Sequence, residues 1–320
     1  MVFVNCVCNH KCYKVTFLQE PATYLFKMKK IFLTTIICLL TTAIFAKPIQ
    51  KINVVAAENF YGSVVSQIGG KYVTVTSILD NPNADPHLFS TSSKISIAIS
   101  NAQIIVYNGA GYDTWMSNLI NSQSNNNKLA IINVGELMGI KDGANPHIWY
   151  QPETFPKFAK IITEKLTGIE HNPEATQYFK DNLKAFLNDN QQVQDKIVQL
   201  TQKYQDTPVT ATEPVFGYMA DALGLKMEGL DFQWKIMNDA EPTPQMLGQY
   251  EENITSHKVK VLFYNDQVTD PTTQNILTLA KKSDIPVVGV SETMPTHDTV
   301  NEWLLAELND TQKALESVQK

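Results

Sequence analysis

The sequence contains no arginine, and this absence excludes several classes of partner. Guanidinium groups provide the planar, two-pronged hydrogen bonds that bind phosphates and carboxylates. The lysines form no basic patch that could follow a phosphate backbone, so we expect no nucleic-acid partner. A receptor for a small anionic organic solute is disfavoured for the same reason.

Cysteine is also absent after the first 46 residues; all four lie before that point, at Cys6, Cys8, Cys12 and Cys38. Two lysines precede an apolar run from Ile31 to Ile44, the pattern of a secretory signal peptide. The run is shorter than the ~20 apolar residues that a membrane-spanning helix needs. We therefore predict an upstream extension (1–27), a signal peptide (28–46) cleaved near Ala46, and export to the periplasm. The mature chain would hold no disulfide, so its hydrophobic core must stabilise it.

The charge balance is acidic. The formal net charge of the whole chain is −6, and the first 46 residues carry five lysines against one glutamate. Removing them leaves about −10 by the same counting. An acidic mature protein is suited to attracting cations.

One long helix is predicted near the middle of the chain, over residues 172–204. Asn172 is a favourable N-cap, and Pro173 suits the first helical position because its missing N–H costs nothing there. Apolar residues then recur every three, four or seven positions on one helix face: Ala175, Phe179, Leu183, Phe186, Val193, Ile197, Leu200 and Tyr204. Such a helix would be about 50 Å long, far beyond the average of ~11 residues. Its length suggests a connection between two halves, but an ordinary long surface helix would show the same periodicity, so the segments on either side decide between the two.

Strands and helices alternate on both sides of this helix. The strands expected before it are 52–56, 72–79, 103–107 and 129–134, and those expected after it are 208–213, 259–265 and 285–292. The alternation predicts an α/β fold with parallel sheets, and a weak internal repeat predicts two similar lobes. The expected order is an N-terminal lobe (47–171), the linking helix (172–204) and a C-terminal lobe (205–320).

Four side chains with the chemistry of metal ligands follow predicted strands: His87, His147, Glu213 and Glu292. In open α/β sheets, ligands bind beyond the carboxyl ends of the strands. Two imidazoles and two carboxylates there would suit a divalent transition metal. No short ligand motif such as H-E-x-x-H joins them. Taken alone, a loop histidine is more often exposed or capping than a ligand, and the same holds for a strand-end glutamate. His297 competes for a place in the site.

Five segments taken together are specific: Ala57–Gly62, Asp85–His87, Asn108–Trp115, Asn145–Tyr150 and Glu213–Phe216. Through them the chain resembles, over essentially its whole mature length, the zinc/manganese solute-binding proteins of bacterial ABC importers. The resemblance implies two α/β lobes joined by one long helix, with a metal cleft between the lobes. It also implies that the metal ligands are His87, His147, Glu213 and Glu292.

The function implied is binding and delivery of a metal, not catalysis. The transported ligand would be Zn2+ or Mn2+, and the partner would be the membrane permease of a metal ABC importer, with the receptor expected as a monomer. Many zinc-dedicated members carry histidine where this chain has Glu213, and a His-rich loop where residues 117–128 hold none. Added carboxylate also suits manganese, but zinc exceeds manganese in the affinity order, so we expect zinc first.

A secreted metallohydrolase is the alternative from another class. It would use two histidines and one glutamate as ligands and the last glutamate as a general base. No nucleophile turn or other catalytic signature accompanies these residues in the sequence.

Overall fold

The computed structural model describes residues 50–83, 86–122, 129–268 and 270–318. Residues 50–320 form one compact unit that contains every described residue. The predicted signal peptide, its extension and all four cysteines lie outside this range, as do Asp85 and the side chain of His87.

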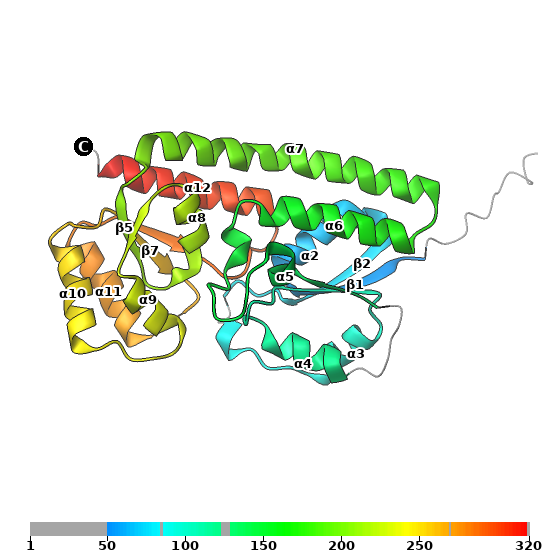
Figure 1. Ribbon diagram of the computed structural model, residues 1–320, viewed down its shortest axis with the longest axis horizontal. Coiled ribbons are helices and arrows are strands. Elements are labelled where there is room, and N and C mark those ends of the chain that lie inside the picture. The colour runs from blue at the N-terminus through cyan, green and yellow to red at the C-terminus, as the bar shows by residue number, and fades with distance from the viewer. Residues whose placement is uncertain (1–49, 84–85, 123–128, 269, 319–320) are drawn as a thin grey trace, which may run out of the picture. The chain divides into compact units, whose positions relative to one another are not determined.

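The first lobe is built on a parallel four-stranded sheet in the order β2-β1-β3-β4 (Figure 1). Its strands are β1 (Ile52–Glu58), β2 (Val73–Leu79), β3 (Ile104–Tyr107) and β4 (Ala130–Asn133). Its helices are α2 (Asn59–Gly69), α3 (Ser93–Ser100), α4 (Thr114–Ser122), α5 (Val134–Met138) and α6 (Thr154–Ile169). Short 3-10 turns lie at Gly70–Tyr72 (η1), Pro86–Leu88 (η2) and Ile148–Tyr150 (η3). The four strands predicted for this lobe are confirmed, within a few residues at their ends.

The second lobe repeats this arrangement, with a parallel sheet in the order β6-β5-β7-β8. Its strands are β5 (Pro208–Ala211), β6 (Lys226–Glu228), β7 (Leu262–Asn265) and β8 (Val287–Val290). Its helical elements are η4 (Pro214–Phe216), α8 (Gly217–Ala222), α9 (Leu230–Met237), α10 (Pro244–Thr255), α11 (Pro271–Lys282) and α12 (Val300–Ser317). The equal strand order confirms two similar lobes. The short edge strand β6 was not predicted from the sequence.

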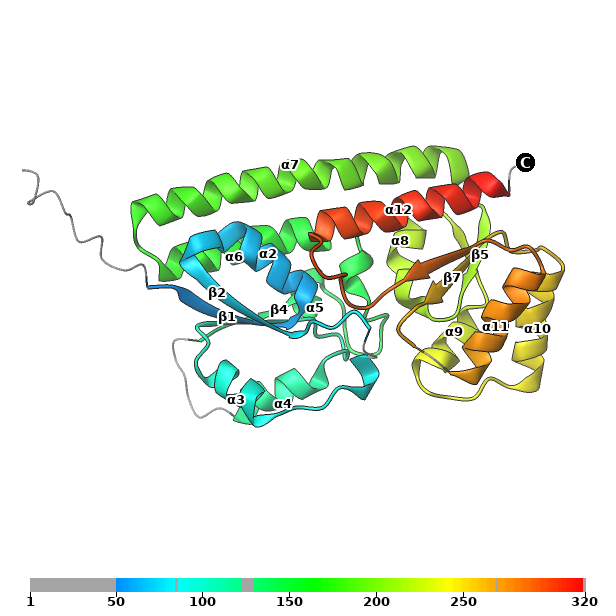
Figure 2. The ribbon, with the colours of Figure 1, turned by 180° about the vertical axis from the view of Figure 1, so that it is seen from behind.

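Helix α7 (Pro173–Tyr204) joins the two lobes and spans 32 residues. It begins where predicted, because the side chain of Asn172 accepts a hydrogen bond from the backbone N–H of Glu174. All residues of the predicted apolar stripe are buried except Leu183, which is half-buried. Asn190 lies in the same stripe and donates a hydrogen bond to Asn301 of α12. Helix α7 packs on α2, α6 and α12, and Figure 2 shows it extending across both lobes.

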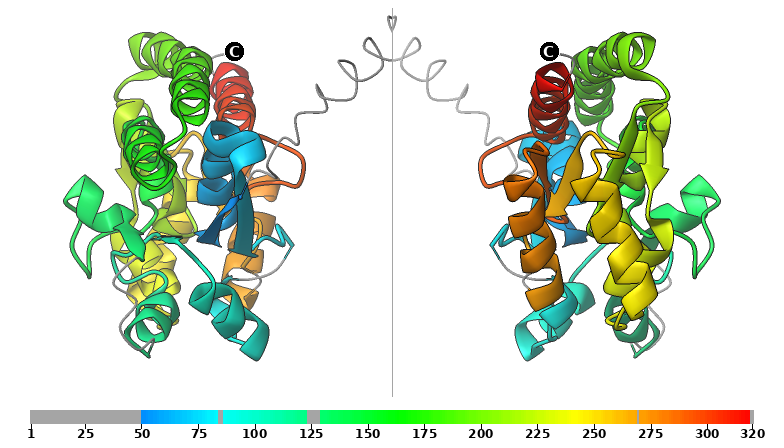
Figure 3. Two further views of the ribbon diagram at one scale, coloured as in Figure 1. Left: turned by 90° about the vertical axis from the view of Figure 1, so that its right-hand side faces the viewer. Right: turned by 90° about the vertical axis from the view of Figure 1, so that its left-hand side faces the viewer.

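Helix α12 returns from the second lobe to α7 and α2, and the end-on views show α12 and α7 side by side (Figure 3). A capping box formed by Thr299 and Glu302 begins the helix. Trp303 stacks on Phe60 of α2, with ring centroids 5.9 Å apart. One hydrophobic core therefore runs through both lobes. Among residues 50–83, 86–122, 129–268 and 270–318, no helix is long and apolar enough to cross a membrane.

A buried acid lies where α12 meets the first lobe. Glu307 Oε1 is 2.8 Å from the hydroxyl of Tyr150 and accepts a hydrogen bond from Trp303 Nε1 at 2.9 Å. Its other oxygen is buried without a partner among the described residues. Burial raises the pKa of Glu307 to about 8, although the hydrogen bonds from Tyr150 and Trp303 oppose this shift. The acid is therefore neutral in the native state below this pH.

Substituting Glu307 by glutamine is expected to flatten the pH dependence of stability. Between the unfolded pKa near 4.5 and the native value near 8, the native state binds the extra proton, so the free energy of unfolding falls as pH rises. The slope is about 1.4 kcal/mol per pH unit, and Glu307→Gln should remove it. Melting temperatures of metal-free protein at pH 5, 6.5 and 8 measure the effect. The control is Glu316→Gln on the same helix, at a partly exposed position. Parallel wild-type and Glu307→Gln curves would contradict the prediction.

Candidate metal centre

Two predicted ligands come from each lobe. His87 lies in η2, after β2, and His147 directly precedes η3, beyond β4. Glu213 and Glu292 each stand two residues after a strand of the second sheet, β5 and β8. The side chains of His147, Glu213 and Glu292 are all buried. The carboxyl ends of both sheets therefore supply the predicted ligands, as expected for this class of fold.

The His147 ring is oriented by Asn145. Asn145 Oδ1 lies 2.7 Å from His147 Nδ1 and also accepts the backbone N–H of His147 at 3.1 Å. The amide nitrogen of Asn145 donates to the carbonyl of Pro214 at 2.8 Å. This hydrogen bond orients the amide so that its oxygen faces the His147 ring. Because Asn145 Oδ1 can only accept, Nδ1 carries the hydrogen, and Nε2 of the neutral ring keeps its lone pair.

The lone pair of His147 Nε2 is directed into the site. This atom is buried without a hydrogen-bond partner among the described residues. It lies 3.7 Å from Oε2 of Glu292, whose side chain is fully buried. A buried lone pair beside a carboxylate is unfavourable, because both groups are electron-rich acceptors and neither supplies a hydrogen to the other. A cation between them would take the lone pair of Nε2 and offset the charge of the carboxylate, so the residues present fit a bound metal ion.

The two carboxylates are held by the amide of Asn265, at the end of β7. Asn265 Nδ2 donates to Glu292 Oε1 at 2.7 Å and to Glu213 Oε1 at 3.2 Å. The other oxygen of Glu292 accepts a hydrogen bond from the hydroxyl of Tyr112 at 2.9 Å. Gln267 Oε1 accepts the backbone N–H of Glu292 at 2.5 Å. Side chains from both lobes thus fix the orientation of Glu292.

The loop that carries Tyr112 is closed by a buried acid pair. Asp113 accepts backbone N–H groups of Asn108 at 2.6 Å and Gly109 at 2.8 Å. Burial, together with the neighbouring charge of Asp113, raises the pKa of Glu58 well above its usual range. Burial also raises the pKa of Asp113, to about 6. Two neighbouring buried carboxyl groups cannot both ionise readily, so a proton is retained on the pair. The two backbone N–H groups that Asp113 accepts hold the loop in place.

The sequence did not identify the supporting residues. Tyr112 and Asn145 belong to segments that carry the family resemblance, yet no role could be assigned to them from sequence alone. Asn265 was overlooked, although it stands at a strand end just as the predicted ligands do. His297, the competitor for the fourth position, is exposed in a left-handed conformation with φ 78°. It is Glu292 that lies against His147.

The predicted ligand set is incomplete in the described part of the structure. Among the side chains described, no three of the His, Cys, Asp and Glu type form a group that could hold a metal ion. The side chain of His87 is outside that description. His147 and Glu292 are in direct proximity, and Asn265 connects Glu213 to them.

Comparison with known proteins identifies the family. The model of the family described as "Zinc-uptake complex component A periplasmic" matches residues 54–314, most of the chain. The chain belongs to this family. Its members are non-enzymatic solute-binding proteins of zinc and manganese ABC importers, so the metallohydrolase alternative is wrong. The chain is accordingly an extracytoplasmic metal-binding component of zinc or manganese uptake.

Individual relatives are distant and differ in the metal that they are named for. The manganese-binding lipoprotein MntA of Halalkalibacterium halodurans is 21% identical over 244 residues, covering 75% of this chain and 78% of MntA. The zinc-binding lipoprotein AdcA of Streptococcus pneumoniae is 22% identical over 269 residues, or 78% of this chain. This chain spans about half, 52%, of the length of AdcA.

A solved structure confirms the fold. The periplasmic zinc-binding protein TroA of Treponema pallidum superposes with a TM-score of 0.69 at 17% identity. The match covers 83% of this chain and 99% of TroA. The predicted architecture, with two parallel-sheet lobes and one long linking helix, is thus confirmed.

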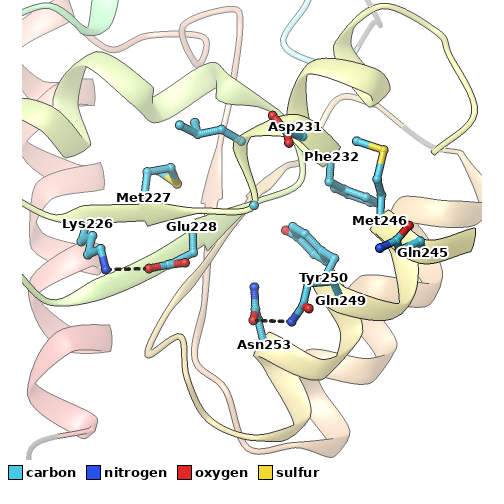
Figure 4. A pocket seen from close by; sticks show the side chains of 12 residues that line it. Lys226, Met227, Glu228, Asp231, Phe232, Gln245, Met246, Gln249, Tyr250 and Asn253 are labelled. Atoms are coloured by element: carbon cyan, nitrogen blue, oxygen red, sulfur yellow. Dashed lines mark hydrogen bonds and ion pairs between the residues drawn. The ribbon is translucent and has the colours of Figure 1, made fainter. Parts of the chain in front are cut away.

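A separate cavity of about 580 Å³ lies in the second lobe between β6, α9 and α10 (Figure 4). None of the four predicted ligands lines it. One of its two carboxylates, Glu228, is paired with Lys258 at 2.9 Å and with Lys226 at 3.1 Å, and these lysines lower its pKa. No histidine is among the residues that line the cavity. We therefore assign this cavity no part in metal binding.

Proposed function

We propose that this protein captures one divalent transition metal ion, zinc first and manganese next, and delivers it to the permease of an ABC importer. The proposed ligands are His87, His147, Glu213 and Glu292. The observation that supports this most is the buried Nε2 of His147, which has no hydrogen-bond partner among the described residues and lies 3.7 Å from Oε2 of Glu292.

The charge balance of the proposed site also favours a divalent cation. Two carboxylates and two neutral imidazoles carry two negative charges, which one doubly charged ion would neutralise. Burying an uncompensated charge is costly, so an ion of matching charge stabilises the closed site. Four protein ligands would fill a tetrahedral shell and leave no position for a reactive water, which suits a carrier.

Location and assembly follow from the same proposal. We infer that residues 28–46 direct export, that cleavage occurs near Ala46, and that the mature protein acts as a monomer in the periplasm. Its organisation would be an N-terminal lobe (47–171), a linking helix (172–204) and a C-terminal lobe (205–320). Delivery would require only that the permease receive the ion from the cleft.

Metal content tests the function directly. Natively purified protein, and metal-free protein reloaded with Zn2+, are expected to hold one ion per chain by mass spectrometry. A metal-free preparation that takes up neither Zn2+ nor Mn2+ would contradict the proposal.

Competition between the two ions tests the order of preference. With equimolar Zn2+ and Mn2+, the metal-free protein is expected to retain zinc, because zinc lies above manganese in the affinity order for the same ligands. Equilibrium dialysis followed by mass spectrometry gives the ratio. Retention of manganese would reverse the order.

A further inference from the structure

We propose that Asn265 is a positioning residue that makes both carboxylates one-oxygen ligands and thereby favours zinc over manganese. This inference rests on the proposed function. It concerns how the site chooses its metal, which the predicted ligands alone leave open.

The position of Asn265 in the sheet explains how one side chain reaches two ligands. It ends β7, which lies between β5 and β8 in the second sheet. Strand β5 leads into Glu213 and strand β8 leads into Glu292. The central strand therefore places the Asn265 side chain between the two carboxylates, where it is 2% exposed.

The orientation of the Asn265 amide is fixed by its neighbours. Its oxygen accepts the backbone N–H of Gln267 at 3.1 Å, so its NH2 group faces the carboxylates. That NH2 group has two hydrogens, one for each glutamate. The two hydrogen bonds, of 2.7 Å to Glu292 and 3.2 Å to Glu213, end on Oε1 in both cases.

This arrangement divides the two oxygens of Glu292 between different roles. Oε1 is held by Asn265, whereas Oε2 lies on the side of His147, 3.7 Å from its Nε2. A two-oxygen carboxylate ligand must turn both oxygens toward the metal, and the Asn265 hydrogen bond opposes that rotation. Glu213 is restrained by the same amide through its own Oε1.

One-oxygen carboxylates keep the number of donor atoms low. Two of them with two imidazoles supply four donors, the number that zinc takes in closed protein sites. Manganese prefers six, mostly oxygen, donors. Asn265 therefore disfavours manganese by withholding the additional carboxylate oxygens.

The test compares Asn265→Ala with a matched control, Asn190→Ala. Asn190 is also a buried asparagine, but its side chain donates to Asn301, which is not a predicted ligand. The zinc-to-manganese affinity ratio of Asn265→Ala is expected to fall by about tenfold or more, since residues that hold a metal ligand typically contribute 10–100-fold. With Co2+ as the probe, its visible absorption should weaken as the coordination number rises. Asn190→Ala should match the wild type in both measurements.

The outcomes separate this inference from the proposed function. An unchanged metal ratio and an unchanged Co2+ spectrum in Asn265→Ala would overturn the role of Asn265 while leaving metal binding intact. If Asn265→Ala does not fold, the wild type decides: an intense four-coordinate Co2+ spectrum supports the inference, and a weak six-coordinate spectrum overturns it. A wild-type protein that takes up no Zn2+ or Co2+ would instead overturn the proposed function.

Discussion

Replacing His147 by alanine is expected to lower the affinity for metal by at least ~100-fold. Loss of a residue that only supports a ligand typically costs about 10–100-fold, and loss of a ligand itself should cost more. The His147 ring is fully buried, and its Nε2 faces Oε2 of Glu292. Without the ring the ion would lose one of four proposed ligands in a site where water replaces it poorly. The same loss is expected for His87→Ala. Titration of metal-free protein against a chelating dye gives both affinities.

The variant should still fold. His147 packs edge-on against Trp149 and Tyr112, with centroid distances of 5.2 and 6.2 Å, so alanine removes some local packing. The shared core of the two lobes and helix α7 do not depend on this ring. We expect a folded apo protein with a modestly lower melting temperature.

His297→Ala is the control for the histidine variants. This exposed side chain should leave metal affinity unchanged. A large loss there would mean that His297, and not Glu292, is the fourth ligand. Unchanged affinity in His147→Ala would contradict the proposed site.

The second large effect is expected from pH. An imidazole must be neutral to donate its lone pair, and histidine in model peptides titrates near ~6.5. With two histidines as ligands, up to two protons compete with one metal ion. Affinity should therefore fall below about pH 6.5, by up to ~100-fold per pH unit if both rings protonate. Carboxylates with free values near ~4 stay ionised over this range.

The pH effect can be measured through thermal stability. Metal bound only to the native state raises the melting temperature by mass action, so the metal-induced shift should shrink as affinity falls. The shift is measured at pH 7.5, 6.5 and 5.5, with the metal-free protein at each pH as the reference. That reference removes the contribution of Glu307, which changes apo stability over the same range. A site of carboxylates alone would keep its affinity down to about pH 5, and an equal shift at all three values would contradict the two-histidine site.

The elements of the fold could be predicted because their signals are local. Helix α7 starts at Pro173, where Asn172 caps it, and its apolar stripe becomes the buried face. Apolar runs likewise located seven of the eight strands. Strand β6, at the edge of its sheet, is only three residues long, and an alternating pattern cannot be recognised over so few residues. The strand orders and the return of α12 to α2 depend on long-range packing, which periodicity does not encode.

The residues of the site likewise fall into those that the sequence could predict and those that it could not. His147, Glu213 and Glu292 could be proposed from the sequence, because polar residues that follow parallel strands gather at one edge of a sheet. Their supporting residues could not, because those contacts join distant parts of the chain: Tyr112 and Glu292 are 180 residues apart. By itself the sequence determined the two similar lobes and the linking helix through hydrophobic periodicity, and it supplied the chemistry of the proposed ligands through residue type. Only the tertiary structure decided which oxygen of Glu292 faces His147 and which is held by Asn265, because hydrogen-bond direction is set by where folding places each donor.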